Sequence, residues 1–99
     1  MDIANLYHRF GEVLASDSGT VITNSFNQIN GYYMLISHGN GFVTYYGHMN
    51  QPGFASVGQY VERGEVIGQI GETGVATGPH IHFEIRYNGQ KMDPALYLR

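Results

Sequence analysis

Residues 73–86 read TGVATGPHIHFEIR, a glycine-rich loop that runs into strict alternation of polar and apolar residues. The alternation predicts a strand, because successive side chains of a strand point to opposite faces. His80, His82, Glu84 and Arg86 then share the polar face, and the apolar residues between them face a core. On such a strand the two histidines have Cα atoms roughly 6–7 Å apart. One metal ion, or a metal and a substrate, can therefore reach both.

A His-x-His pair is not specific by itself. Two histidines on the polar face of a strand can simply be solvated, since short motif matches carry a false-positive risk. The preceding loop favours a site, because Gly74 and Gly78 permit positive φ, while Pro79 fixes its own φ and holds Gly78 extended. A backbone this constrained, leading directly into two histidines, indicates a functional site.

The composition is typical of a small β protein. The 99 residues suffice for one domain with a modest core and include 14 Gly, 8 Tyr, 5 Phe and no Cys. Glycines and aromatic residues favour turn-rich β structure, and the lack of cysteine excludes disulfides and thiolate zinc sites. A net charge of −3 argues against nucleic-acid binding. No apolar run approaches the roughly 20 residues of a membrane span, and the start of the chain lacks signal-peptide features.

The strand signals are short and separated by turns. An Asn-Gly pair, the strongest short hairpin signal, occurs at Asn40-Gly41 and again at Asn88-Gly89. From these patterns we expect a loop over 5–11, then strands over 13–15 and 20–23 joined by a turn at 17–19, and a second loop over 24–31. Paired strands over 32–37 and 42–49 follow, and then short strands within 57–71. The histidine strand comes next, and a tail from Met92 with a helical turn ends the chain. The predicted fold class is all-β, with many short antiparallel strands.

Several blocks together resemble one family. GPHIHFE at 78–84, SHGNGFVTYYGHM at 37–49 and VGQYVERGEVIG at 57–68 resemble, in the correct order, blocks of the lysostaphin-type (LytM-like) zinc endopeptidases. GETG at 71–74 and Asp93-Pro94 also fit, so the resemblance covers nearly the whole chain. It implies a single LytM-like domain over 1–99, built as a duplicated hybrid motif or barrel-sandwich.

The resemblance also implies the site residues. The family binds Zn2+ through a His-x-x-x-Asp motif and the second histidine of His-x-His, which correspond here to Asp2 and His82. The first histidine of His-x-His, His80, and the histidine of the Tyr-x-His block, His48, would act in catalysis without binding the metal. The histidine four positions before Asp2 would precede Met1, so we expect the domain to begin inside this motif. His8, in the predicted loop, is an alternative third ligand.

Other polar and aromatic residues have competing interpretations. His38, in the His-Gly-Asn-Gly turn, is expected to be structural. Glu84 can orient a ligand imidazole or simply be a surface carboxylate. Tyr45, Tyr46 and Tyr60 can line a substrate groove or pack in the core, and Thr77 can contact substrate or stabilise its loop.

The function implied by the resemblance is zinc-dependent hydrolysis of peptide bonds in bacterial peptidoglycan, whose peptides would be the partners. The expected location is extracellular or in the cell wall of a bacterium, or in a phage; the oligomeric state stays open. The alternative is a catalytically degenerate LytM-like module that binds cell wall or activates another wall hydrolase. A biotinyl- or lipoyl-like carrier, suggested by 57–74, is set aside because the only lysine, Lys91, lies outside that segment.

Overall fold

Antiparallel strands make up most of the described chain. The computed structural model describes residues 7–8, 11–71 and 82–92. Within these ranges no α-helix occurs, and no helix is long and apolar enough to cross a membrane. The strands are β1 (Tyr7–His8), β2 (Glu12–Leu14), β3 (Gly19–Asn27), β4 (Gly31–Gly39), β5 (Phe42–Met49), β6 (Tyr60–Val61), β7 (Val66–Gln69), β8 (His82–Tyr87) and β9 (Gln90–Met92). The predicted fold class, all-β with short antiparallel strands, is confirmed.

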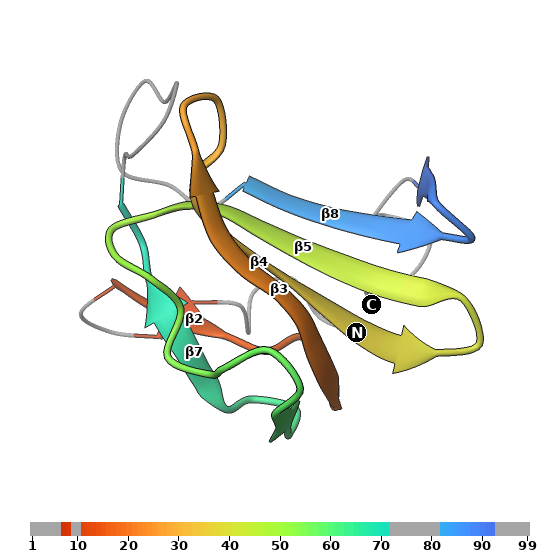
Figure 1. Cartoon of the computed structure of the whole chain (residues 1–99). Helices are drawn as coiled ribbons and strands as arrows, with labels where there is room; N and C mark the ends of the chain where they lie inside the picture. Colours follow the sequence, from red (N-terminus) through yellow and green to blue (C-terminus); the bar gives the residue numbers. More distant parts are fainter. Residues whose placement is uncertain (1–6, 9–10, 72–81, 93–99) are drawn as a thin grey trace.

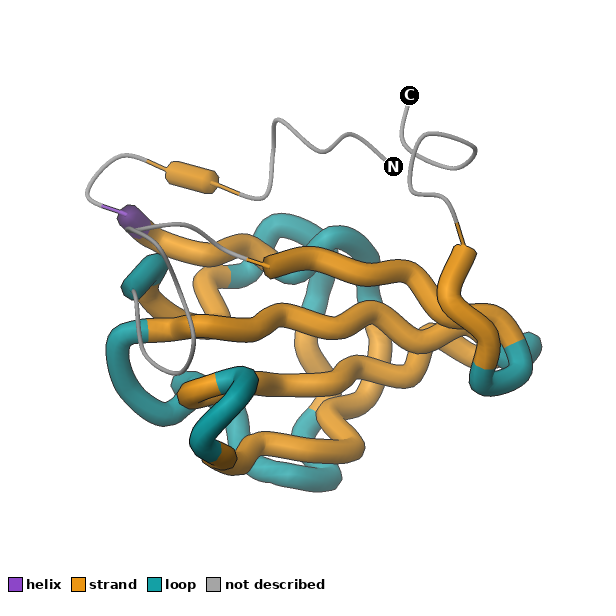
Figure 2. The backbone as a smooth tube through the Cα atoms, turned by 90° about the horizontal axis from the view of Figure 1, so that it is seen from above, coloured by secondary structure: helices purple, strands orange, loops and turns teal. Residues whose placement is uncertain are grey.

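The strands form two sheets (Figure 1). The larger sheet has the order β6-β3-β4-β5-β8-β9, and the smaller has the order β1-β2-β7. The end of β5 is joined to the end of β7 by a bridge between Met49 and Ile70 and by a hydrogen bond from the Asn50 N–H to the Gln69 carbonyl (3.0 Å). In the tube view of Figure 2, the long strands β4, β5 and β8 run side by side along the molecule.

One apolar core lies between the sheets. Its side chains come from both sheets and from the segments that follow β2 and β5, and they are almost completely shielded from solvent: Val13, Ala15, Val21, Met34, Ile36, Tyr46, Met49, Ala55, Val61 and Ile67. Val61 of β6 and Ile67 of β7 are both fully shielded from solvent, so the short strands also contribute to this core. Burial of this kind is the main favourable contribution to folding, and it includes Tyr46 and Met49 of β5, an interior strand of the larger sheet.

Both predicted Asn-Gly hairpins are present. Asn40 and Gly41 have φ of 53° and 84°, and Asn88 and Gly89 have φ of 50° and 84°. Positive φ at both central residues defines the type I′ turn, whose twist matches that of the flanking strands. These turns set the registers of β4 with β5 and of β8 with β9.

The predicted loop over 24–31 is wrong, because β3 continues to Asn27. The second half of β3 is polar and lacks the apolar alternation that predicts a strand. Pairing with β4 satisfies its backbone instead. The Asn24 amide also donates two hydrogen bonds of 2.9 Å to the carbonyls of Gly53 and Ala55. These bonds attach β3 to the segment between β5 and β6.

The predicted hairpin between 13–15 and 20–23 is also wrong. β2 pairs with β1 and β7, whereas β3 pairs with β4 and β6. The chain crosses from one sheet to the other at Ala15, whose N–H donates to the Glu65 carbonyl and whose carbonyl accepts from the Gly64 N–H. The predicted loop over 5–11 likewise contains β1, so His8 lies in a strand whose register partner is Glu12.

Candidate functional site

The candidate site lies where the end of β5 meets the start of β8. In the register of these strands Gly47 lies opposite His82, Phe83 opposite Tyr46, and Glu84 opposite Tyr45. Directly opposed residues of antiparallel strands have Cα atoms about 4.5–5.5 Å apart. His48 follows Gly47, so the structure brings the backbones of two predicted site residues, His48 and His82, together from distant parts of the sequence.

His48 has an unusual backbone for a strand residue. Its φ is 60°, in the left-handed region that non-glycine residues seldom adopt, and its side chain is 9% exposed. The His48 N–H donates a hydrogen bond of 2.8 Å to the carbonyl of Asn30 in the β3–β4 turn. This bond compensates part of the conformational cost and fixes the position of His48 relative to the turn.

The β3–β4 turn is itself ordered by one side chain. The Asn27 Oδ1 accepts hydrogen bonds from the N–H groups of Ile29 (3.0 Å) and Asn30 (2.6 Å). This is the local side-chain to backbone bonding that makes asparagine common in turns. The turn thus presents the Asn30 carbonyl to His48, a role that the sequence analysis missed because the segment was predicted to be an irregular loop.

Gly47 allows an aromatic ring to lie across β5 beside the candidate site. A Cβ atom on residue 47 would be only 2.6 Å from the Tyr45 hydroxyl oxygen and 2.8 Å from its Cε1. The Tyr45 ring is 3% exposed. Glycine at position 47 therefore gives the Tyr45 ring its place opposite the first residues of β8.

The polar face of β8 carries a connected group of charged and aromatic side chains. Arg86 donates from Nε (3.0 Å) and Nη2 (2.9 Å) to the Oε1 of Glu84, and Lys91 Nζ lies 3.2 Å from Glu84 Oε2. The Arg86 guanidinium lies over the Tyr45 ring, 5.1 Å from its centroid. Burial, followed by the negative charge of Glu84, raises the pKa of Tyr45 to about 12, although Arg86 acts in the opposite direction.

The predicted alternation in β8 is confirmed from Phe83 to Arg86, whereas Tyr87, also predicted to face the core, is 40% exposed. Ile85 is buried and Phe83 packs against the core, with its ring 5.4 Å from that of Tyr46. Glu84 and Arg86 lie on the other face. The Glu84 carboxylate, whose side chain is 11% exposed, pairs with two cations, Arg86 and Lys91. Tyr45 and Tyr46 are buried, whereas Tyr60 is 61% exposed.

A chain of buried hydrogen bonds occupies the other end of β5. His38 Nδ1 lies 2.7 Å from the Ser18 carbonyl, and His38 Nε2 lies 2.7 Å from Thr44 Oγ1. Thr44 Oγ1 is in turn 2.8 Å from the Tyr46 hydroxyl, which accepts from the Ser16 N–H (3.0 Å) and contacts Ser16 Oγ (2.9 Å). Burial raises the pKa of Tyr46, and the hydrogen bonds with Ser16 and Thr44 oppose that rise.

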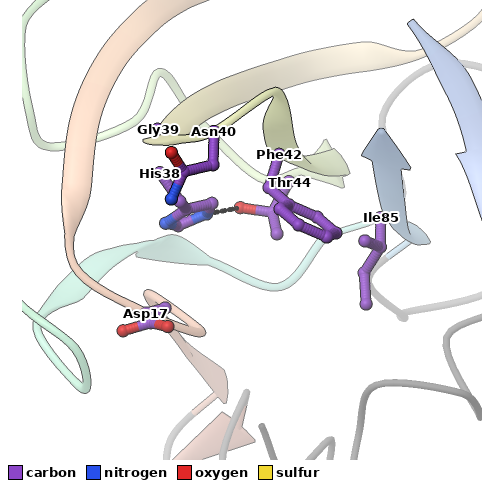
Figure 3. Close-up of a pocket in the computed structure, with 7 residues that line it drawn as sticks. All are labelled: Asp17, His38, Gly39, Asn40, Phe42, Thr44 and Ile85. Atoms are coloured by element: carbon purple, nitrogen blue, oxygen red, sulfur yellow. Dashed lines mark hydrogen bonds between the residues drawn. The ribbon is translucent and has the colours of Figure 1, made fainter. Parts of the chain in front are cut away.

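This chain borders a cavity of about 290 Å³ (Figure 3). Figure 3 shows His38 and Thr44 hydrogen-bonded to each other in its wall. The cavity is lined by Asp17, His38, Gly39, Asn40, Phe42, Thr44 and Ile85. It lies beside the first residues of β5, away from His48. Both nitrogens of His38 join parts of the fold, and this agrees with its predicted structural role.

Two predicted site residues, Asp2 and His80, lie outside the described residues, as does Thr77. Among the residues that the structure does describe, no three His, Cys, Asp or Glu side chains lie close enough together to hold a metal ion. The predicted donor set of Asp2 and His82 provides a carboxylate oxygen and an imidazole nitrogen, both of which suit zinc. The chemistry of the predicted ligands therefore fits the predicted metal.

Comparisons with known proteins relate almost the whole chain to one family. Residues 1–94 match the profile described as "Peptidase family M23". The chain is 40% identical over 82 residues to "Peptidoglycan DD-endopeptidase ShyC" of Vibrio cholerae, covering 83% of this chain and 19% of that protein. It is 37% identical over 87 residues to "Murein hydrolase activator EnvC" of Escherichia coli, covering 88% of this chain and 20% of that protein. The chain thus spans about a fifth of the length of these curated relatives.

Solved structures show the same fold. The catalytic domain of the antimicrobial peptidase lysostaphin from Staphylococcus simulans superposes with a TM-score of 0.82 at 28% identity, covering 92% of this chain and 73% of that one. A zinc-containing peptidase from Vibrio cholerae superposes with a TM-score of 0.78 at 32% identity, covering 84% of this chain and 26% of that one.

Proposed function

The chain belongs to peptidase family M23, and from this premise we propose that it is a zinc-dependent endopeptidase that hydrolyses peptide bonds of bacterial peptidoglycan. The observation that carries the proposal is the register of β5 and β8, which puts His48 next to the strand that begins at His82. The name of the ShyC relative supports peptidoglycan as the substrate. The working place of such an enzyme is the space that contains peptidoglycan, outside the cytoplasm.

His82 and Asp2 are the proposed zinc ligands on this chain, and a third protein ligand completes the usual set of three. When bound, zinc polarises the scissile carbonyl and lowers the pKa of a coordinated water. The link to a zinc-containing relative supports this assignment. His8, the alternative ligand, lies in β1, and the pairing of β1 with β2 would oppose a movement of His8 toward the site.

His48 and His80 are the proposed catalytic residues. An imidazole can accept and donate a proton near neutral pH, so each can assist the attack of water or protonate the leaving amine. For His48, the hydrogen bond to Asn30 and the left-handed backbone restrict where the imidazole can be placed. A fixed position suits a group that must meet one atom of the substrate.

A catalytically degenerate module is the second candidate, favoured by the similarity to the murein hydrolase activator EnvC. Such a module would bind the cell wall or another hydrolase without catalysis, and it would have no chemical need for His48, His80, His82 and Asp2 together. The presence of all four in this sequence supports the enzyme.

The test compares cleavage of purified peptidoglycan by the wild-type protein with cleavage by His48→Ala and His80→Ala variants. We expect both substitutions to abolish release of soluble peptides while the circular dichroism spectrum stays unchanged. Arg63→Gln, an exposed substitution in the turn between β6 and β7, is the control and should retain activity. Full activity in both His48→Ala and His80→Ala would contradict the proposed roles.

A further inference from the structure

Two cations share one carboxylate on the polar face of β8 and β9. Arg86 lies opposite Lys91 in the register, and both contact Glu84, through its Oε1 and Oε2 respectively. Among the described residues, this cluster therefore combines two positive charges with one negative charge. The chain as a whole has a formal net charge of −3. The positive charge is therefore a local feature of this face.

Arg86 is held in position before any ligand arrives. Two of its nitrogens donate to the same Glu84 oxygen, and its guanidinium lies 5.1 Å from the centroid of the Tyr45 ring. Tyr45 is in turn stacked on Tyr33, with ring centroids 5.8 Å apart and an angle of 26° between the rings. An arginine ordered in this way loses little conformational freedom when it binds a ligand.

Donors remain for another acceptor. Guanidinium has five N–H donors, and no contact within the described part of the chain uses Nη1 of Arg86. The side chains of Arg86 and Lys91 are 31% and 69% exposed, so both are accessible to a ligand. A carboxylate is the ligand group that matches a planar guanidinium with an ammonium beside it.

The cluster lies along the strand that leads away from the candidate site. Arg86 is four residues beyond His82 on β8, about 13 Å at 3.3 Å per residue. An extended peptide spans that distance with about four residues, at up to 3.6 Å each. A substrate cleaved beside His82 can therefore place an acidic group at Arg86.

We infer that Arg86 and Lys91 bind a carboxylate of the peptide substrate, so that the site selects acidic peptides over neutral ones. This inference rests on the proposed peptidase function, because that function supplies a peptide at His82. Glu84 orients Arg86 and reduces the positive charge of the cluster, while the face of the Tyr45 ring contacts the guanidinium.

The test uses two fluorescent peptidoglycan stem-peptide dimers that differ only in having free carboxylates or carboxamides at their acidic residues. Binding to the full-length, zinc-loaded protein is measured by fluorescence anisotropy, and cleavage is measured separately as kcat/KM. We expect the wild-type protein to bind the acidic peptide about tenfold more tightly, a difference of about 1.4 kcal/mol. Arg86→Gln should reduce this preference to less than about threefold, with the loss in KM rather than kcat.

Arg63→Gln is the matched control, because Arg63 is an exposed arginine in the turn between β6 and β7. It should keep the full preference. Lys91→Gln should also weaken the preference for the acidic peptide. Because the Lys91 side chain is 69% exposed, this variant is expected to fold normally. An unchanged preference in both Arg86→Gln and Lys91→Gln, or no preference in the wild-type protein, would overturn the inference.

The two proposals fail in different ways. Equal cleavage of the acidic and neutral peptides would leave the peptidase standing and remove the carboxylate site. No cleavage of either peptide, together with an Arg86-dependent preference in binding, would support the carboxylate site and contradict the peptidase.

Discussion

Removal of a single hydroxyl group from the core should measurably destabilise the protein. In the Tyr46→Phe variant the aromatic ring keeps its packing against Phe83, and only the oxygen is lost. That oxygen accepts from the Ser16 N–H and is hydrogen-bonded to the hydroxyls of Ser16 and Thr44. Ser16 is 8% exposed and Thr44 is 1% exposed, so water cannot readily replace the lost partner.

The magnitude follows from which groups are orphaned. Thr44 keeps its contact with His38, so the main loss is the partner of the Ser16 N–H. A buried donor left without an acceptor costs about 1–3 kcal/mol, and the weakened hydroxyl contacts increase that cost. We expect the free energy of unfolding to fall by about 2–3 kcal/mol, and the melting temperature to fall by about 10–20 °C for a domain of this size.

The assay is urea unfolding followed by circular dichroism, with the m-value checked for constancy. Tyr60→Phe is the matched control, because Tyr60 is 61% exposed and should change stability by less than about 0.5 kcal/mol. A Tyr46→Phe variant as stable as the Tyr60→Phe control would refute the reasoning that this hydrogen-bond chain stabilises the fold.

Three further predictions concern the neighbourhood of the site and the turns. Gly47→Ala should displace the Tyr45 ring and cost about 1–3 kcal/mol in urea unfolding; combining it with Tyr45→Ala should cost less than the sum of the two single changes, and strict additivity would contradict the contact. Folding raises the pKa of Tyr45 from 10.0 to about 12, so the contribution of this group to the free energy of unfolding is fully present below pH 10 and is lost as pH rises toward 12. Tyr45→Phe should make the loss of stability over this pH range less steep. An equally steep loss in the variant would contradict the raised pKa of Tyr45. Gly89→Ala, at φ 84° with open space around it, should cost about 1 kcal/mol from backbone strain alone; no loss of stability would contradict the type I′ turn.

The sequence predicts the parts of the fold in which local chemistry and tertiary structure agree. Asn-Gly pairs produced both hairpins, and apolar alternation correctly gave the faces of β8. The polar half of β3 has no apolar alternation, and its stability comes from pairing with β4 and from the Asn24 side chain. The Asn30-Gly31 pair that precedes β4 is a local signal for this hairpin. The partners of β2 and β3 were missed because long-range registers decide them.

The candidate site shows the same division. The motifs that contain His48 and His82 are visible in the sequence, and the register brings their strands together. The left-handed backbone of His48 and its bond to Asn30 had no sequence signal beyond the asparagines of the turn. Arg86 was correctly placed on the polar face, but its pairing with Lys91 depends on a hairpin register that only the structure specifies.

The most direct test of the account is the zinc content of the purified full-length protein, measured by elemental analysis in the wild type and in two single variants. We expect about one zinc per chain in the wild type, loss of that zinc in His82→Ala, and its retention in His48→Ala, because His48 is proposed to act without binding the metal. A wild-type protein without zinc after incubation with excess metal, or a His82→Ala variant that binds zinc as tightly as the wild type, would contradict it.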